Sequence, residues 1–248
     1  MNAVTAVVST SRGLVRQVNE DSVGALGWLA PAETPTPVSL STRTTDPVVV
    51  AVADGLGGHP AGAVASRLAV EQLLAAAPDL VGPPAVEGAC RRIHARILQA
   101  GAARPERTGM ATTLVAAVIA ADKVIVCHVG DSRVYYVEPG LVEQLTTDDA
   151  EPGGNGALLQ VLGGRADARL EPHVTALPLD AAARFLLCSD GLHNCIPRNR
   201  LRALAAEADP LAAVTGLAAA ARDAGAPDNV SICLLTFDEQ APGPEDRR

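Results

Sequence analysis

The centre of the chain is a series of short apolar runs separated by tight turns. The runs at 112–120, 123–129 and 133–137 are rich in Val, Ile and other apolar residues, and only two or three residues separate them. Strands joined by such short connections lie antiparallel, because a parallel pair needs a crossover of about a dozen residues or more. The sequence therefore predicts an antiparallel sheet at the core of the fold.

The expected helices come in consecutive pairs and do not alternate with the strands. Apolar residues recur at helical spacing over 60–77 and 84–104, and Ala- and Leu-rich segments follow at 199–208 and 210–224. A doubly wound parallel sheet would need a helix between successive strands. We therefore predict an antiparallel β core that is covered by helices.

The remaining segments complete this outline. The segment 30–47 is rich in Pro, Thr and Ser, which predicts an exposed, mobile loop that could cover part of a cleft. We expect one domain over 1–238 and a disordered tail over 239–248. Further strands are expected at 3–9, 48–53, 142–145, 172–176, 184–188 and 230–237.

Charge and hydropathy exclude several classes of function. The chain has 20 Lys and Arg against 28 Asp and Glu, a net charge of −8, and no basic block, so we expect no nucleic-acid partner. No apolar run reaches the roughly 18 residues that a membrane span needs, and the N-terminus lacks a secretory pattern. These features predict a cytoplasmic protein without a membrane partner.

The cysteines predict no chemistry. Five of them are spread along the chain without a CxxC pair, which is typical of reduced thiols in a core. Cys90 and Arg96 match the C-x₅-R spacing of cysteine-dependent phosphatases, but that stretch has helical periodicity and no Gly to form a phosphate-binding loop. Motifs of nucleotide-binding loops, zinc peptidases and serine hydrolases are absent from the sequence.

Carboxylates gather where apolar runs meet Gly, Ser or Asn. This pattern occurs at Asp54, Asp131, Asp190 and Asp228, and an acidic Glu20-Asp21 pair follows the first strand. Each Asp alone is explained as a turn former. Strand ends on one side of a sheet converge, however, and four or five carboxylates gathered there need cations to offset their repulsion.

The type of ligand selects the cation. Carboxylates without Cys or clustered His favour Mg²⁺ or Mn²⁺ over Zn²⁺. Two such ions can activate a water and stabilise both oxygens of an in-line phosphoryl displacement, so the pattern predicts metal-assisted hydrolysis. Arg16, just before the acidic pair, is either a solvated surface residue or a guanidinium that binds two phosphate oxygens.

Six motifs in order resemble one known family. The runs RGLVRQVNEDS, VADGLGGHPAGAVAS, GMATTL, VGDSRVYYV, LLCSDGL and PDNVS are similar to successive motifs of the metal-dependent protein phosphatases, the type-2C serine/threonine phosphatases, in their bacterial form. The match spans roughly residues 5 to 237. The resemblance implies an α+β fold, with a central antiparallel β-sandwich flanked by helix pairs in four αββα layers.

The resemblance also implies a role for each acidic position. Asp54 would bridge two Mn²⁺ or Mg²⁺ ions, and Arg16 would bind the substrate phosphate. Asp131, together with Asp190, would hold a weaker third ion. The Gly55 carbonyl oxygen would bind one of the two bridged ions, and Asp190 and Asp228 would complete the protein ligands of the other. Glu20 and Asp21 would hold metal or its water shell.

The implied activity is hydrolysis of phosphoserine and phosphothreonine on proteins. A serine/threonine kinase would be the opposing enzyme, and the chain is expected to be a monomer.

Two departures from the family bear on this prediction. Leu56 stands where many eukaryotic relatives have a His that protonates the leaving group, and only eight residues separate Asp149 from Leu158, where relatives carry a longer flap. The alternative function is an inactive module that binds a phosphoprotein or a regulatory partner.

Overall fold

The computed structural model describes residues 3–56, 61–138, 140–151 and 157–238. Two six-stranded antiparallel sheets form its centre, with a small three-stranded sheet beside them. In spatial order, the first sheet contains β11 (Leu141–Gln144), β10 (Arg133–Glu138), β14 (Arg184–Cys188), β15 (Val230–Asp238), β1 (Ala3–Ser11) and β4 (Thr34–Arg43). The second contains β13 (His173–Pro178), β9 (Lys123–Val129), β8 (Leu114–Ala120), β5 (Val48–Ala53), β2 (Ser22–Ala25) and β3 (Trp28–Leu29).

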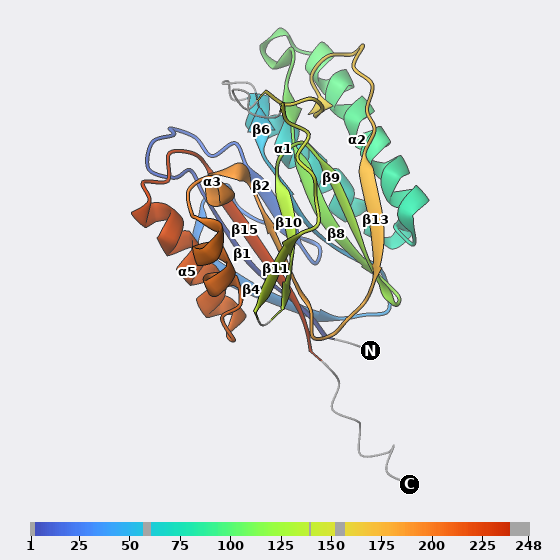
Figure 1. Cartoon of the computed structure of the whole chain (residues 1–248). Coiled ribbons are helices and arrows are strands. Elements are labelled where there is room, and N and C mark those ends of the chain that lie inside the picture. The colour runs from blue at the N-terminus through green and yellow to red at the C-terminus, as the bar shows by residue number, and fades with distance from the viewer. Residues whose placement is uncertain (1–2, 57–60, 139, 152–156, 239–248) are drawn as a thin grey trace.

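Helices cover the outer face of each large sheet (Figure 1). The second sheet is covered by α1 (Ala61–Ala75) and α2 (Pro83–Ala102). The first sheet is covered by α3 (Asp190–His193), α4 (Arg198–Ala205) and α5 (Pro210–Asp223). Short 3₁₀ helices lie at Ala77–Asp79 and Pro105–Arg107. The four-layer αββα arrangement and the α+β class predicted from the sequence are confirmed.

The central strands of the two sheets are buried on both faces, which explains their continuous hydrophobic runs. Along β5, Val50 and Val52 pack between the sheets, whereas Val49 and Ala51 pack under the helices. β8 alternates in the same way. A strand buried on both faces cannot alternate apolar with polar residues, so these strands appear in the sequence as unbroken apolar stretches.

The segment 30–47 is not the loop that its composition predicts. Residues Thr34–Arg43 form β4, which pairs antiparallel with β1 through Val38 opposite Val8. The prediction was wrong because β4 is an edge strand, which needs ladder hydrogen bonds on one side only and therefore tolerates Pro35 and Pro37. The short strands β2 and β3 were also missed.

The cysteines are free, as predicted. Cys90 lies buried within α2, so its segment is a helix and not a phosphate-binding loop. The predicted tail, 239–248, and most of the short flap lie outside the described residues. No helix in the described part of the chain is both long and apolar enough to cross a membrane.

Candidate active site

One pocket collects five of the six acidic residues that the sequence singled out. It has a volume of about 430 Å³. Its lining residues include Arg16, Glu20, Asp54, Gly55, Asp131, Asp190 and Asp228, together with Leu56, Leu158 and Asn229. Most of these side chains come from the segments that follow β1, β5, β9 and β14 and from the segment that precedes β15, so the expected convergence occurs.

Asp54 is fixed by the backbone and by two threonines. Its amide N–H donates to Thr113 Oγ1 at 3.0 Å, and its carbonyl oxygen accepts from Thr112 Oγ1 at 2.8 Å. The following residue, Gly55, pairs with Thr112 in the small sheet formed by β6 (Gly55–Leu56), β7 (Ala111–Thr112) and β12 (Leu162–Gly163). Both threonines belong to the GMATTL motif, but nothing in the sequence indicated this role for them.

Gly55 lies where three segments meet. A Cβ atom at this position would lie 2.4 Å from the backbone of Gly62 and 2.5 Å from the carbonyl oxygen of Glu20. Only glycine permits this approach. The Asp54-Gly55 pair is therefore more than a turn: it brings the start of α1 and the Glu20 loop against the pocket.

Asn229 is a site residue that the sequence analysis missed. Its Oδ1 accepts from the Glu20 amide at 2.8 Å, and its Nδ2 donates to the carbonyl oxygens of Arg12 and Val18 at 3.1 and 3.0 Å. It therefore holds both ends of the loop that carries Arg16. Its position directly after Asp228 was the only signal in the sequence.

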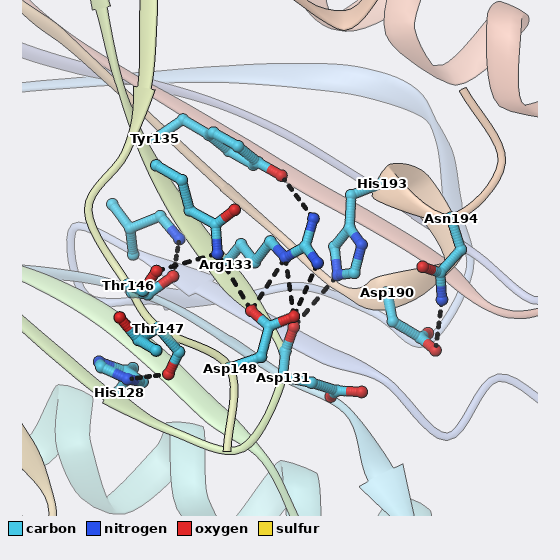
Figure 2. A network of polar contacts seen from close by, with 12 residues as sticks. His128, Asp131, Arg133, Tyr135, Thr146, Thr147, Asp148, Asp190, His193 and Asn194 are labelled. Atoms are coloured by element: carbon cyan, nitrogen blue, oxygen red, sulfur yellow. Dashed lines mark hydrogen bonds and ion pairs between the residues drawn. The ribbon is translucent and has the colours of Figure 1, made fainter. Parts of the chain in front are cut away.

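Asp131 and Asp190 are held by neighbours on α3 and just after it (Figure 2). His193 Nε2 lies 3.1 Å from the Asp131 carbonyl oxygen, and Asn194 Nδ2 donates to Asp190 Oδ2 at 3.2 Å. Burial raises the pKa of the Asp131 carboxyl to about 6, and the charge of Asp190 adds to this rise. These carboxylates are therefore close enough to affect one another.

Asp21 lies outside the lining of the pocket. Its side chain is buried, 3% exposed, and its Oδ2 accepts a hydrogen bond from Ser189 Oγ at 2.8 Å. Burial raises the pKa of Asp21 to about 7, despite hydrogen bonds from Ser189 and Ser231. Asp21 thus lies among the residues that support the pocket.

The donor set fits divalent cations with oxygen ligands. Five carboxylates line the pocket with a single Arg, and burial, followed by the charges of neighbouring carboxylates, raises the pKa of Asp54 well above its usual value. Asp21 Oδ1 and Asp190 Oδ1 are buried and accept no hydrogen bond from any described residue. Such a site is costly unless cations neutralise it, and oxygen ligands favour Mg²⁺ or Mn²⁺.

Comparison with known proteins identifies the family. The family model described as protein phosphatase 2C matches residues 38–229. The chain belongs to the protein phosphatase 2C family. It is 30% identical to the serine/threonine phosphatase stp of Listeria monocytogenes, with 92% of this chain and 94% of that protein covered. This membership makes it a metal-dependent serine/threonine protein phosphatase, as predicted.

A further relative comes from Mycobacterium tuberculosis. The serine/threonine protein phosphatase PstP is 29% identical over 91% of this chain, which covers 43% of PstP. A crystal structure of PstP/Ppp has a TM-score of 0.80 and 28% identity, with 96% of this chain and all of that chain covered. The PstP catalytic domain solved in complex with two manganese ions has a TM-score of 0.79 and 28% identity.

Proposed function

We propose that the acidic pocket hydrolyses phosphoserine and phosphothreonine monoesters on proteins. Asp54 would bridge two Mn²⁺ or Mg²⁺ ions, and Asp190, Asp228 and the Gly55 carbonyl oxygen would complete their protein ligands. The observation that carries this proposal is the convergence of five carboxylates and one guanidinium on one open pocket. When bound, the ions would supply Lewis acidity and a nucleophilic water at neutral pH.

The chain's own residues orient the reaction. Arg16 has 51% of its side chain exposed, so its guanidinium can donate hydrogen bonds to two phosphoryl oxygens. Glu20 and Asp21 would hold ligand water or support the metals, and Asp131 with Asp190 would hold a weaker third ion. None of the described lining residues is Ser, Thr, Cys or His. This composition argues against a phosphorylated Ser, Thr, Cys or His as an intermediate, and the proposal assigns the carboxylates to the metal ions, so we expect direct attack by water.

The leaving oxygen receives its proton from solvent in this proposal. Leu56 lines the pocket at the position where many eukaryotic relatives have a His. Leu cannot transfer a proton, and the proposal assigns the carboxyls that line the pocket to the metal ions, which leaves no carboxyl for this step. We therefore expect water bound in the open pocket to protonate the seryl or threonyl oxygen.

The described residues of the short flap lie beside the pocket. Two backbone hydrogen bonds join the two arms of the flap. The Glu151 amide donates to the Ala157 carbonyl oxygen at 3.0 Å, and the Leu159 amide donates to the Asp149 carbonyl oxygen at 2.7 Å. Leu158 is the flap residue that lines the pocket. We propose a single-domain phosphatase over 1–238 that acts as a monomer in the cytoplasm, opposite a serine/threonine kinase.

Phosphate release from a phosphothreonine peptide tests the proposal. We expect turnover with Mn²⁺, loss of turnover with EDTA, and recovery when Mn²⁺ is restored. Acid-quenched reactions with a ³²P-labelled peptide should leave no label on the protein. If Mn²⁺-loaded protein fails on phosphothreonine, phosphoserine and a small aryl phosphate, the proposal is wrong and the inactive-module alternative replaces it.

A further inference from the structure

Three metal-binding side chains meet outside the acidic pocket. His128 on β9 and His173 on β13 lie directly opposite each other in the antiparallel register. Their rings stack with centroids 4.5 Å apart and an interplanar angle of 14°. Asp149, which follows β11, places Oδ1 2.9 Å from His173 Nε2. One ligand atom from each of the three residues lies within 4.8 Å of the others.

The Asp149 carboxylate is oriented by neighbours that leave Oδ1 available. Its Oδ2 accepts from the Gly130 amide at 2.9 Å and from Gln160 Nε2 at 2.8 Å. The Gln160 amide is itself fixed, because it donates to the Glu171 carbonyl oxygen and accepts from the Glu171 amide, both at 3.1 Å. With both amide hydrogens used, Gln160 has none for His173 Nε2, 3.0 Å away. Either a proton or a cation can therefore link Asp149 Oδ1 to His173 Nε2.

His128 is held in the state that binds metals. Its Nε2 lies 2.9 Å from the Thr147 carbonyl oxygen, a contact visible in Figure 2. A carbonyl oxygen only accepts, so Nε2 carries the hydrogen and the neutral ring keeps its lone pair on Nδ1. Burial lowers the pKa of His128, which favours this neutral form. Metal-binding histidines usually donate their second ring N–H to such a carbonyl or carboxylate.

The donor set differs from that of the acidic pocket. Two imidazole nitrogens and one carboxylate oxygen are typical of zinc sites with three protein ligands and an open fourth position, whereas Mg²⁺ prefers oxygen alone. The His173 side chain is 48% exposed, so solvent reaches the open position. We infer that His128, Asp149 and His173 form a second metal site, which binds one Zn²⁺ separately from the acidic pocket.

An ion at this site would fasten two segments of the acidic pocket to the second sheet. Asp149 and Gly130 already exchange two hydrogen bonds, one of them between their backbones at 2.9 Å, and Gly130 precedes Asp131. The Leu159 amide donates to the Asp149 carbonyl oxygen, and its neighbour Leu158 lines the pocket. Zinc should therefore raise the melting temperature of the protein.

Zinc stoichiometry on the full chain tests this inference. We expect the wild-type chain to bind one more Zn²⁺ than His173→Gln. Asp54→Asn changes the acidic pocket only, so it should still bind the additional Zn²⁺ at the His173 site. Cobalt provides a second readout, because Co²⁺ with nitrogen ligands in a tetrahedral site absorbs visible light more strongly than octahedral Co²⁺ with oxygen ligands. His94→Gln is the matched control: His94 Nδ1 accepts from the Gly163 amide at 3.1 Å, outside the cluster.

Chemical modification of His173 is a test that does not require the His173→Gln variant to fold. Zinc should protect His173 from diethyl pyrocarbonate, as read by mass spectrometry, both in the wild-type chain and in Asp54→Asn. Equal zinc stoichiometry in wild type and His173→Gln, or loss of protection in Asp54→Asn, would overturn the inference. In that case His173 and Asp149 form only a hydrogen bond beside the stacked ring of His128.

Discussion

Arg16 Nη2 donates to Asp228 Oδ2 at 2.6 Å, although 212 positions separate the two residues. The charge of Asp228 and this hydrogen bond raise the pKa of the guanidinium further. The pair holds the proposed phosphate-binding group directly beside a proposed metal ligand. Since half of the Arg16 side chain is exposed, we expect its remaining donors to be accessible to a substrate phosphate.

Arg16→Lys should weaken substrate binding more than metal binding. Lysine keeps the positive charge but loses the planar fork that binds two phosphoryl oxygens. We expect kcat/KM for a phosphothreonine peptide to fall by roughly tenfold or more, which corresponds to about 1.4 kcal/mol. Steady-state kinetics and Mn²⁺ titration on the same protein check this. Unchanged kcat/KM would remove Arg16 from the substrate site.

Asp190→Asn should abolish most of the activity while the fold survives. The substitution removes one anionic metal ligand but keeps the shape of the side chain, so we expect kcat to fall by about a hundredfold or more even at saturating Mn²⁺. Asp167→Asn is the matched control, because Asp167 pairs with Arg165 on the exposed surface. Near-wild-type activity of Asp190→Asn would contradict its assignment as a ligand.

Protons and metal ions should compete for the acidic residues. In the metal-free fold, burial raises the pKa of Asp131 to about 6 and that of Asp21 to about 7, from about 3.9 in an unfolded chain. Between about pH 4 and 7 the folded chain therefore binds more protons than the unfolded chain. The stability that these bound protons contribute is complete below about pH 4 and is lost as the pH rises through the folded-state pKa values.

Two measurements check this competition. The free energy of unfolding in EDTA should fall between about pH 4 and 7, and Mn²⁺ should reduce that fall because the ions replace the protons. Mn²⁺ affinity, measured by titration calorimetry, should rise over the same interval. A pH-independent Mn²⁺ affinity would show that these carboxyls do not contribute to binding.

Gly13→Ala should disturb the loop that carries Arg16. Gly13 has a φ of +73°, and an added Cβ would lie 2.1 Å from the Asp228 carbonyl oxygen and 2.6 Å from that of Ala226. Gly27→Ala is the matched control, because Gly27 has a φ of +82° with nothing within 4 Å. Both variants incur the left-handed backbone cost of roughly 1–2 kcal/mol, and Gly13→Ala adds the clash. Urea denaturation should therefore show a clearly larger loss for Gly13→Ala; equal losses would refute the clash.

The sequence by itself determined the layers of the fold and the chemistry of the pocket. Apolar runs and their short turns specified the antiparallel strands, since periodicity and turn length are local properties. Carboxylates at strand ends indicated a metal site for the same reason: the end of a strand can be located from its neighbours. Asp54 and Asp190 could thus be singled out and placed in one pocket before any coordinates were known.

Only the tertiary structure decided the features that depend on distant partners. β4 is a strand because β1 lies beside it, and its prolines are tolerated because its other edge is free of ladder bonds. Asn229 binds backbone atoms more than two hundred positions away, and Asp21 is buried by the serines around it. His128 and His173 become a pair through strand register alone. Long-range register and burial leave no local pattern, because they arise from packing between segments that the sequence keeps far apart.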